Sequence, residues 1–104
     1  MENRLIQIAK FDWNRSNIDK IREKHNVEPH ECEEAFFNEL FISTDESHSH
    51  AEQRYHALGI TNSDRLLFIV FTIRAKKIRV ISARDVNKKE RRIYYEKIKE
   101  NTQI

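Results

Sequence analysis

The chain has few of the residues that turns, crosslinks and membrane spans require. Its 104 residues include one glycine, one proline and one cysteine. The single cysteine, Cys32, excludes a disulfide within the chain and fits a reducing compartment. No apolar run approaches membrane-spanning length, and the apolar segment 5–8 is too short and too soon interrupted by charge for a signal peptide. We therefore expect a cytoplasmic protein without a membrane segment.

The sequence also lacks internal repeats, low-complexity tracts, linkers and a glycine-rich phosphate-binding loop. The missing loop argues against a nucleotide-binding enzyme, and we expect no cofactor. The length predicts one domain, 1–104, which is large enough for a single hydrophobic core. Charged residues make up 35% of the chain, but the hydrophobic 38% fall in periodic segments, so we expect a folded protein.

Charge is unevenly distributed along the chain, although the formal net charge is only +2. Most acidic residues lie in 28–52 and most basic residues in 74–99. This asymmetry indicates two surfaces with different partners, one of them nucleic acid. Two solvated helix faces would produce the same distribution, so the pattern alone does not decide between them.

Periodicity predicts an α+β fold with the element order β-α-α-β-β-β-α. The expected elements are a strand over 5–11, helices over 15–25 and 29–39, strands over 53–60, 65–73 and 77–84, and a helix over 87–100. Residues 66–71 are apolar on both faces, which is typical of a central strand. Short turns predict that the last three strands form an antiparallel sheet, with the helices packed mainly on one face.

Local signals mark the helix ends. Asn14 or Ser16 is expected to cap the first helix, and Asn26 to end it in the left-handed conformation. Pro29 suits the first turn of the second helix. The polar segment 45–52 is expected to form a loop.

Residues 78–95 contain the side chains that metal-free RNA cleavage requires: a strand that ends in Arg84, then a basic helix that begins near Glu90. Cleavage needs a grip on phosphate, a base for the 2′-hydroxyl and stabilisation of charge at phosphorus. Strand alternation puts Arg54 and His56 on one face. We expect Arg54 and Arg84 to hold one phosphate, because guanidinium binds phosphate bidentately. Surface arginines that prevent edge pairing are the alternative.

Two residues are candidates for the proton transfer. His25 is one, because histidine exchanges protons near neutral pH, but it lies on the apolar face of its helix and a structural role is the alternative. Glu90 is the other, although a glutamate in a first helical turn commonly interacts with the helix dipole or a cation. Arg84 would share a face with Ile78 and Val80 if no bulge intervenes, and would then pair with Glu90.

Several further residues are expected to contact RNA by charge or by stacking on bases. Of the neighbours Tyr94 and Tyr95, one is expected to belong to the core instead. These RNA-binding candidates are Lys24, Lys88, Arg91 and Tyr94.

Residues 45–56 raise the question of a metal site, because Asp45, His48, His50 and His56 lie close together in sequence. Their spacing matches no zinc pattern, so a polar loop without metal is expected. Cys32 lacks the partners of an activated nucleophile and is expected in the core.

The chain resembles the BrnT family of toxins from type II toxin–antitoxin systems. Matching segments occur in the same order nearly from end to end, with Asn26 where the family has glycine and Glu28 where it has threonine or serine. The segments are Phe11-Asp12-Trp13, Asn17-Ile18, Lys24-His25, Glu33-Glu34-Ala35-Phe36, Arg54-Tyr55, Arg65-Leu66-Leu67, Arg79-Val80-Ile81-Ser82-Ala83-Arg84 and Glu90-Arg91.

The resemblance implies a RelE-like ribonuclease fold and an RNA-cleaving toxin that arrests translation. Together with the residues named above, we expect a metal-independent endoribonuclease. Attack by the 2′-hydroxyl would leave a cyclic phosphate. BrnT toxins are neutralised by a cognate BrnA antitoxin, and the hetero-oligomeric complex binds promoter DNA through the antitoxin. Two other functions remain open: a catalytically weak RelE-like partner in a transcriptional repressor complex, and a stand-alone nucleic-acid-binding module.

Overall fold

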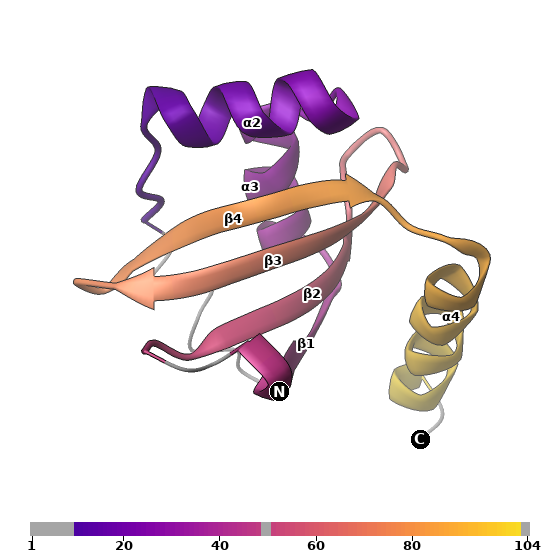
Figure 1. Cartoon of the computed structure of the whole chain (residues 1–104). Helices are drawn as coiled ribbons and strands as arrows, with labels where there is room; N and C mark the ends of the chain where they lie inside the picture. Colours follow the sequence, from indigo (N-terminus) through magenta and orange to yellow (C-terminus); the bar gives the residue numbers. More distant parts are fainter. Residues whose placement is uncertain (1–9, 49–50, 103–104) are drawn as a thin grey trace.

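The computed structural model describes residues 10–48 and 51–102, which form one antiparallel sheet and three α-helices. The strands follow one another in the order β1-β2-β3-β4. They are β1 (Leu40–Thr44), β2 (Arg54–Ile60), β3 (Leu66–Arg74) and β4 (Lys77–Asp85). The helices are α2 (Arg15–His25), α3 (Pro29–Phe37) and α4 (Lys88–Thr102), with a short 3-10 helix η1 (Glu46–His48). Helix α4 stands beyond the end of the sheet at which β4 finishes (Figure 1).

The local signals at the helix ends act as expected. The Asn14 side chain accepts a hydrogen bond of 2.9 Å from the backbone N–H of Asn17 and caps α2. Asn26 ends the helix at φ 53°, and its N–H donates to the carbonyl of Arg22. Pro29 opens α3. These caps confirm the predicted bounds of α2 and the predicted start of α3.

Strand β3 is the inner strand that its doubly apolar pattern predicted, since it pairs with β2 on one side and β4 on the other. Leu67, Ile69 and Phe71 are completely buried in the core that α2 and α3 cover. The rings of Phe36 and Phe71 meet edge to face, with their centres 5.0 Å apart. Burial of each large side chain contributes about 1.5–3 kcal/mol, so this core dominates the stability of the fold.

Two strands differ from the prediction. Residues 40–44 were not expected to form a strand, yet they make β1 and pair with β2, with Leu40 opposite Gly59. Most of the predicted strand 5–11 lies outside the described residues. Among the residues that the structure describes, Phe11 of this segment forms one parallel bridge to Ile78 of β4. The element order therefore gains a strand between α3 and β2.

A β-bulge in β4 changes which side chains share a face. Val70 pairs with Ser82 and Phe71 with Val80, so Ile81 is the extra residue. Arg84 therefore faces away from Val80, contrary to the expectation without a bulge. The face opposite α2 and α3, here called the second face, includes Arg54, His56 and Leu58 of β2, Phe68, Val70 and Thr72 of β3, and Arg79, Ser82 and Arg84 of β4.

Helix α4 departs from the expectation that the helices pack mainly on one face, which holds for α2 and α3 only. Its Tyr94 ring contacts Phe41, whose partner Leu58 lies on the second face. Its Glu90 pairs with Arg84 on the same face. The helix therefore packs on the end of the second face and closes one side of a hollow there.

Gly59 is required by the close approach of α3 to β2. A Cβ at this position would lie 3.0 Å from the Ala35 Cβ and 3.1 Å from the Ala35 carbonyl oxygen. We expect Gly59→Ala to lower the free energy of unfolding by about 1–3 kcal/mol, because helix backbone cannot move aside locally. Urea denaturation measures this change. An unchanged midpoint would show that α3 shifts freely on the sheet.

Candidate active site

A hollow of about 540 Å³ lies between the second face and the start of α4. Its floor includes Phe41, Leu58 and Phe68, and Ile93 of α4 also lines it. Its polar lining comprises Ser43, His56, Asn87, Lys89, Glu90 and Lys97. An apolar floor with a few convergent polar groups is typical of a ligand site.

Arg84 is held from three directions beside this hollow. Its Nη1 and Nη2 donate to the two carboxylate oxygens of Glu90 at 2.9 and 3.0 Å, and Nη1 also donates to the Asp85 carbonyl. The guanidinium carbon lies 4.3 Å from the centre of the Phe68 ring. The hydrogen bonds to Glu90 raise the pKa of Arg84 further, so it is always a cation.

The guanidinium of Arg84 keeps one bidentate edge for a ligand. Its contacts with Glu90 and Asp85 use Nη1 and one side of Nη2. Nε forms no hydrogen bond with the described residues. Nε and the remaining hydrogen of Nη2 form the second fork of arginine, which matches two oxygens of a phosphate.

Glu90 both orients Arg84 and caps α4. Its Oε1 accepts from the backbone N–H of Asn87 at 2.9 Å, and its own N–H donates to the Asn87 side chain at 2.8 Å. The hydrogen bond from Arg84 is the main reason that the pKa of Glu90 lies below its usual value. A carboxylate with a lowered pKa is a weaker base, which favours a positioning role.

His56 also contacts the Phe68 ring and is paired with a buried carboxylate. Its Nε2 lies 3.0 Å from Oδ2 of Asp45, whose side chain is 6% exposed. The centres of the His56 and Phe68 rings are 4.9 Å apart. A carboxylate only accepts hydrogen bonds, so Nε2 carries the proton and Nδ1 has the lone pair in the neutral ring.

Asp45 also binds the residues of η1. His48 Nδ1 lies 3.0 Å from Oδ2, and the Ser47 hydroxyl donates to Oδ1. Burial raises the pKa of Asp45, but the hydrogen bonds from His48, Ser47 and His56 outweigh it and bring the pKa to about 2. The predicted loop 45–52 thus contains an ordered charge that stays ionised at neutral pH.

The two arginines expected to share one phosphate lie apart. Arg84 pairs with Phe68, whereas Arg54 pairs with Thr72 on the other side of β3. Four strand residues span about 13 Å, so these side chains start from separate positions on the second face. Arg84 lies beside the hollow, where it contacts the lining residues Phe68 and Glu90, and Arg54 lies nearer the β3–β4 turn.

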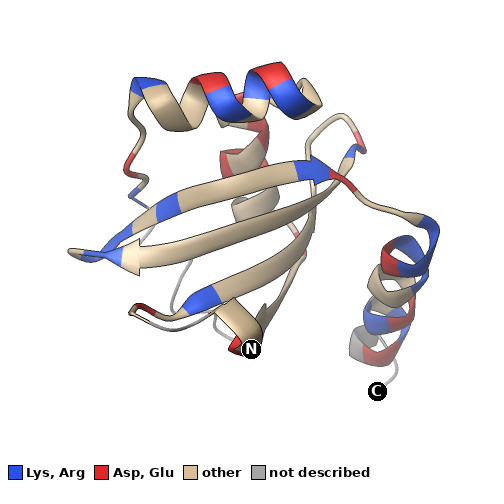
Figure 2. Ribbon diagram, in the orientation of Figure 1, with Lys and Arg blue, Asp and Glu red and all other residues tan. Residues whose placement is uncertain are grey.

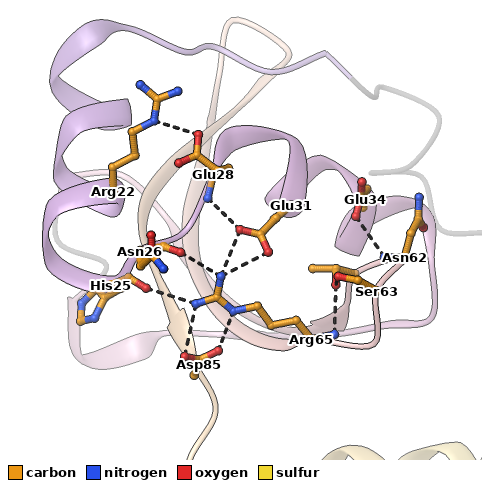
Figure 3. A network of polar contacts seen from close by, with 11 residues as sticks. Arg22, His25, Asn26, Glu28, Glu31, Glu34, Asn62, Ser63, Arg65 and Asp85 are labelled. Carbon is orange, nitrogen blue, oxygen red and sulfur yellow. Dashed lines mark hydrogen bonds and ion pairs between the residues drawn. The ribbon is translucent and has the colours of Figure 1, made fainter.

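His25 and Lys24 end α2, away from the lining of the hollow. The His25 carbonyl accepts from Nη2 of Arg65, which also binds Glu31 and Asp85 (Figure 3). The hydrogen bond from Arg65 is the main cause that lowers the pKa of Asp85. This network joins the end of α2 to α3 and β4, so it has a structural role that the sequence did not reveal.

Tyr94 is a core residue rather than an RNA contact. It is 1% exposed, and its hydroxyl donates to the Glu39 carbonyl at 2.9 Å. Burial is the main reason that its pKa rises to about 12. Tyr95 is 46% exposed, and the candidates Lys88 and Arg91 are exposed in the first turns of α4. One tyrosine in the core and one outside is the arrangement expected.

Cys32 lies in the core, as predicted. It is fully buried, and burial is the main cause that raises its pKa to about 12, so its thiol is unreactive. His50 lies outside the described residues. Within them, no group of three or more metal-binding side chains is arranged to hold an ion.

His56 is the functional candidate that the sequence analysis overlooked. Alternation places it beside Arg54, but its partner Asp45 lies in a segment whose polar composition predicts only a loop. Its proximity to Arg84 depends on the bulge at Ile81, which no turn residue marks.

Comparison with known proteins supports a family assignment. The family model described as the ribonuclease toxin BrnT of type II toxin–antitoxin systems matches residues 13–90. A search among curated proteins gives no match. No helix in the described part of the chain is long and apolar enough to cross a membrane. The matched segment includes Asp45, His56, Arg84 and Glu90, and covers three quarters of the chain. The chain therefore belongs to the BrnT family of ribonuclease toxins, for which a type II system implies an antitoxin partner.

Proposed function

We propose that this chain is a metal-independent endoribonuclease that cleaves RNA by attack of a 2′-hydroxyl on the neighbouring phosphate. The observation that carries the proposal is the placement of His56 and Arg84 against the same Phe68 ring, beside one hollow. A proton acceptor and a phosphate-binding cation are the two groups that this reaction needs most.

His56 is the proposed general base, in place of His25. The Asp45 carboxylate fixes the ring through Nε2, which leaves Nδ1 to take the proton of the 2′-hydroxyl. The 2′-oxygen then bonds to phosphorus, the bond from phosphorus to the 5′-oxygen breaks, and that oxygen takes up a proton. The products are a 2′,3′-cyclic phosphate and a 5′-hydroxyl.

Arg84 is the proposed stabiliser of the charge that develops on the phosphate oxygens. Glu90 holds one fork of the guanidinium and presents the Nε edge. Lys89 and the amino-terminal end of α4 add positive potential at the hollow. Preorganised donors of this kind are worth more where protein excludes water.

A substitution at Glu90 distinguishes a positioning role from a role as the general base. We expect Glu90→Gln to reduce the cleavage rate by less than about tenfold, because glutamine retains the capping bond and one bond to Arg84. Loss of a general base would cost about 10²–10⁴-fold. Glu96→Gln, at an exposed position on the same helix, is the matched control. A loss of 10²-fold in Glu90→Gln alone would make Glu90 the base.

We further propose that the chain arrests translation and is neutralised by a BrnA-like antitoxin, through which the complex binds promoter DNA. Expression of the chain alone should stop growth, and co-expression of the antitoxin should restore it. Harmless accumulation of the soluble wild-type chain would contradict a toxin. In that case, co-purification of an antitoxin would indicate a repressor subunit, whereas nucleic-acid binding without a partner would indicate a stand-alone module.

A further inference from the structure

A second group of cations lies on the second face, at the end remote from α4. Arg54 of β2 and Arg79 of β4 pair with Thr72 from opposite sides. Arg74 and Lys77 pair with each other at the adjoining turn. Figure 2 shows these basic positions along β4 and at the start of β2, separate from the basic residues of α4.

The surroundings of this group favour a phosphate. Thr72 is 1% exposed, and its hydroxyl donates to the Gln53 carbonyl, so it brings no charge between the arginines. Glu52 pairs with Arg74 at 3.2 Å. Within the described part of the chain, no acidic side chain forms an ion pair with Arg79. Because Arg54 and Arg79 lie on the two strands that flank β3 at Thr72, their guanidinium groups can approach the same anion.

The floor between the two groups of cations suits the backbone of a single strand. Along β3 the second face runs from Thr72 through Val70 to Phe68, where Arg84 lies. His56 and Ser82 flank Val70, so no acidic strand residue interrupts this path on β2, β3 or β4. A groove with cations at both ends and no acidic residue between them is an arrangement that tracks the backbone of a single strand.

We propose that Arg54 and Arg79 form a subsite for a flanking phosphate of a single-stranded RNA that lies along β3. This inference rests on the proposed function, since the cleaved phosphate would lie at Arg84. The register separates the two positions by about 13 Å, which requires more than one nucleotide of an extended strand. Arg54 would thereby bind substrate away from the cleaved bond rather than stabilise the reacting phosphate.

The test uses RNA oligonucleotides with one mapped cleavage site, extended stepwise on either side. For the wild-type chain, extension on one side by more than one nucleotide should lower KM on the order of tenfold. In Arg79→Gln and Arg54→Gln this gain should be lost, while kcat on the shortest cleaved strand stays unchanged. Arg79→Lys should recover part of the gain, since it retains the charge. Lys20→Gln removes an exposed charge from α2, across the sheet, and should behave as wild type.

Binding of a 2′-O-methylated strand, which cannot be cleaved by this route, provides an independent measurement. Loss of one phosphate contact should reduce the slope of log Kd against log salt concentration by about 0.7 for a single strand. An unchanged slope and an unchanged effect of length in both glutamine variants would overturn the subsite and leave the proposed function standing. Failure of the wild-type chain to cleave any RNA would instead overturn the proposed function, and the subsite with it.

Discussion

Replacing His56 with alanine should lower the rate of RNA cleavage by about 10²–10⁴-fold, because the reaction loses its proton acceptor. The side chain is 34% exposed and its ring lies against Phe68, so the loss of packing should leave the chain folded. Single-turnover cleavage of one labelled RNA measures the effect, and the melting temperature confirms the fold. The pKa of Asp45 is about 2, so an inflection of the rate near neutral pH would not come from this carboxylate.

Two controls accompany this variant. His30→Ala changes an exposed histidine on α3, across the sheet from the hollow, and should cleave as wild type does. Asp45→Asn retains the size of the carboxyl group but not its charge, and should also slow cleavage, because the His56 ring loses its fixed tautomer. Wild-type rates in His56→Ala would exclude the ring as the base.

Arg84→Lys should reduce the cleavage rate by about 10²–10³-fold although the positive charge is conserved. A lysine ammonium cannot bind Glu90 with one fork and phosphate with the other, since it lacks the planar guanidinium. The pair with Glu90 is 35% exposed on the Arg84 side, so its loss should cost little stability. Arg92→Lys, in the exposed part of α4, is the matched control and should be neutral. A full rate in Arg84→Lys would reduce the role of Arg84 to that of a general positive charge.

The sequence predicted those parts of the fold that depend on local signals. The cap at Asn14, the left-handed Asn26 and the run 66–71 each act through nearby backbone or through burial on both faces, and each appears as expected. Antiparallel pairing of β2, β3 and β4 followed from two short turns. Periodicity and turn residues report such features directly.

Features set by distant pairing could not be predicted in the same way. Leu40–Thr44 contains Phe, Ile and Thr, which favour a strand, but five residues directly after a helix do not specify that they pair with the edge of β2. The bulge at Ile81 turns Arg84 towards α4, and no glycine marks that position. Helix α4 packs at the second face beside Arg84, with which its Glu90 pairs. The amphipathic pattern of α4 predicts that the helix covers an apolar surface but not which face of the sheet it covers.

The candidate site shows the same division. A pair between Arg84 and Glu90 was expected on the condition that no bulge intervenes. Both carboxylate bonds are present, but the bulge puts Arg84 on the other face of β4. The role of His56 could not be predicted, because its partner Asp45 reaches it only through the pairing of β1 with β2. Arg54 and Arg84 were assigned to one phosphate because strand order along the sheet was known but register was not.

The chemistry of the RNA ends tests the proposed mechanism most directly. Purified wild-type chain should cleave RNA in the presence of a chelator and leave a 2′,3′-cyclic phosphate and a 5′-hydroxyl. His56→Ala prepared in the same way should leave the RNA intact, which excludes a contaminating nuclease. Cleavage that stops in chelator, or that leaves a 3′-hydroxyl and a 5′-phosphate, would contradict attack by the 2′-hydroxyl and the roles proposed for His56 and Arg84.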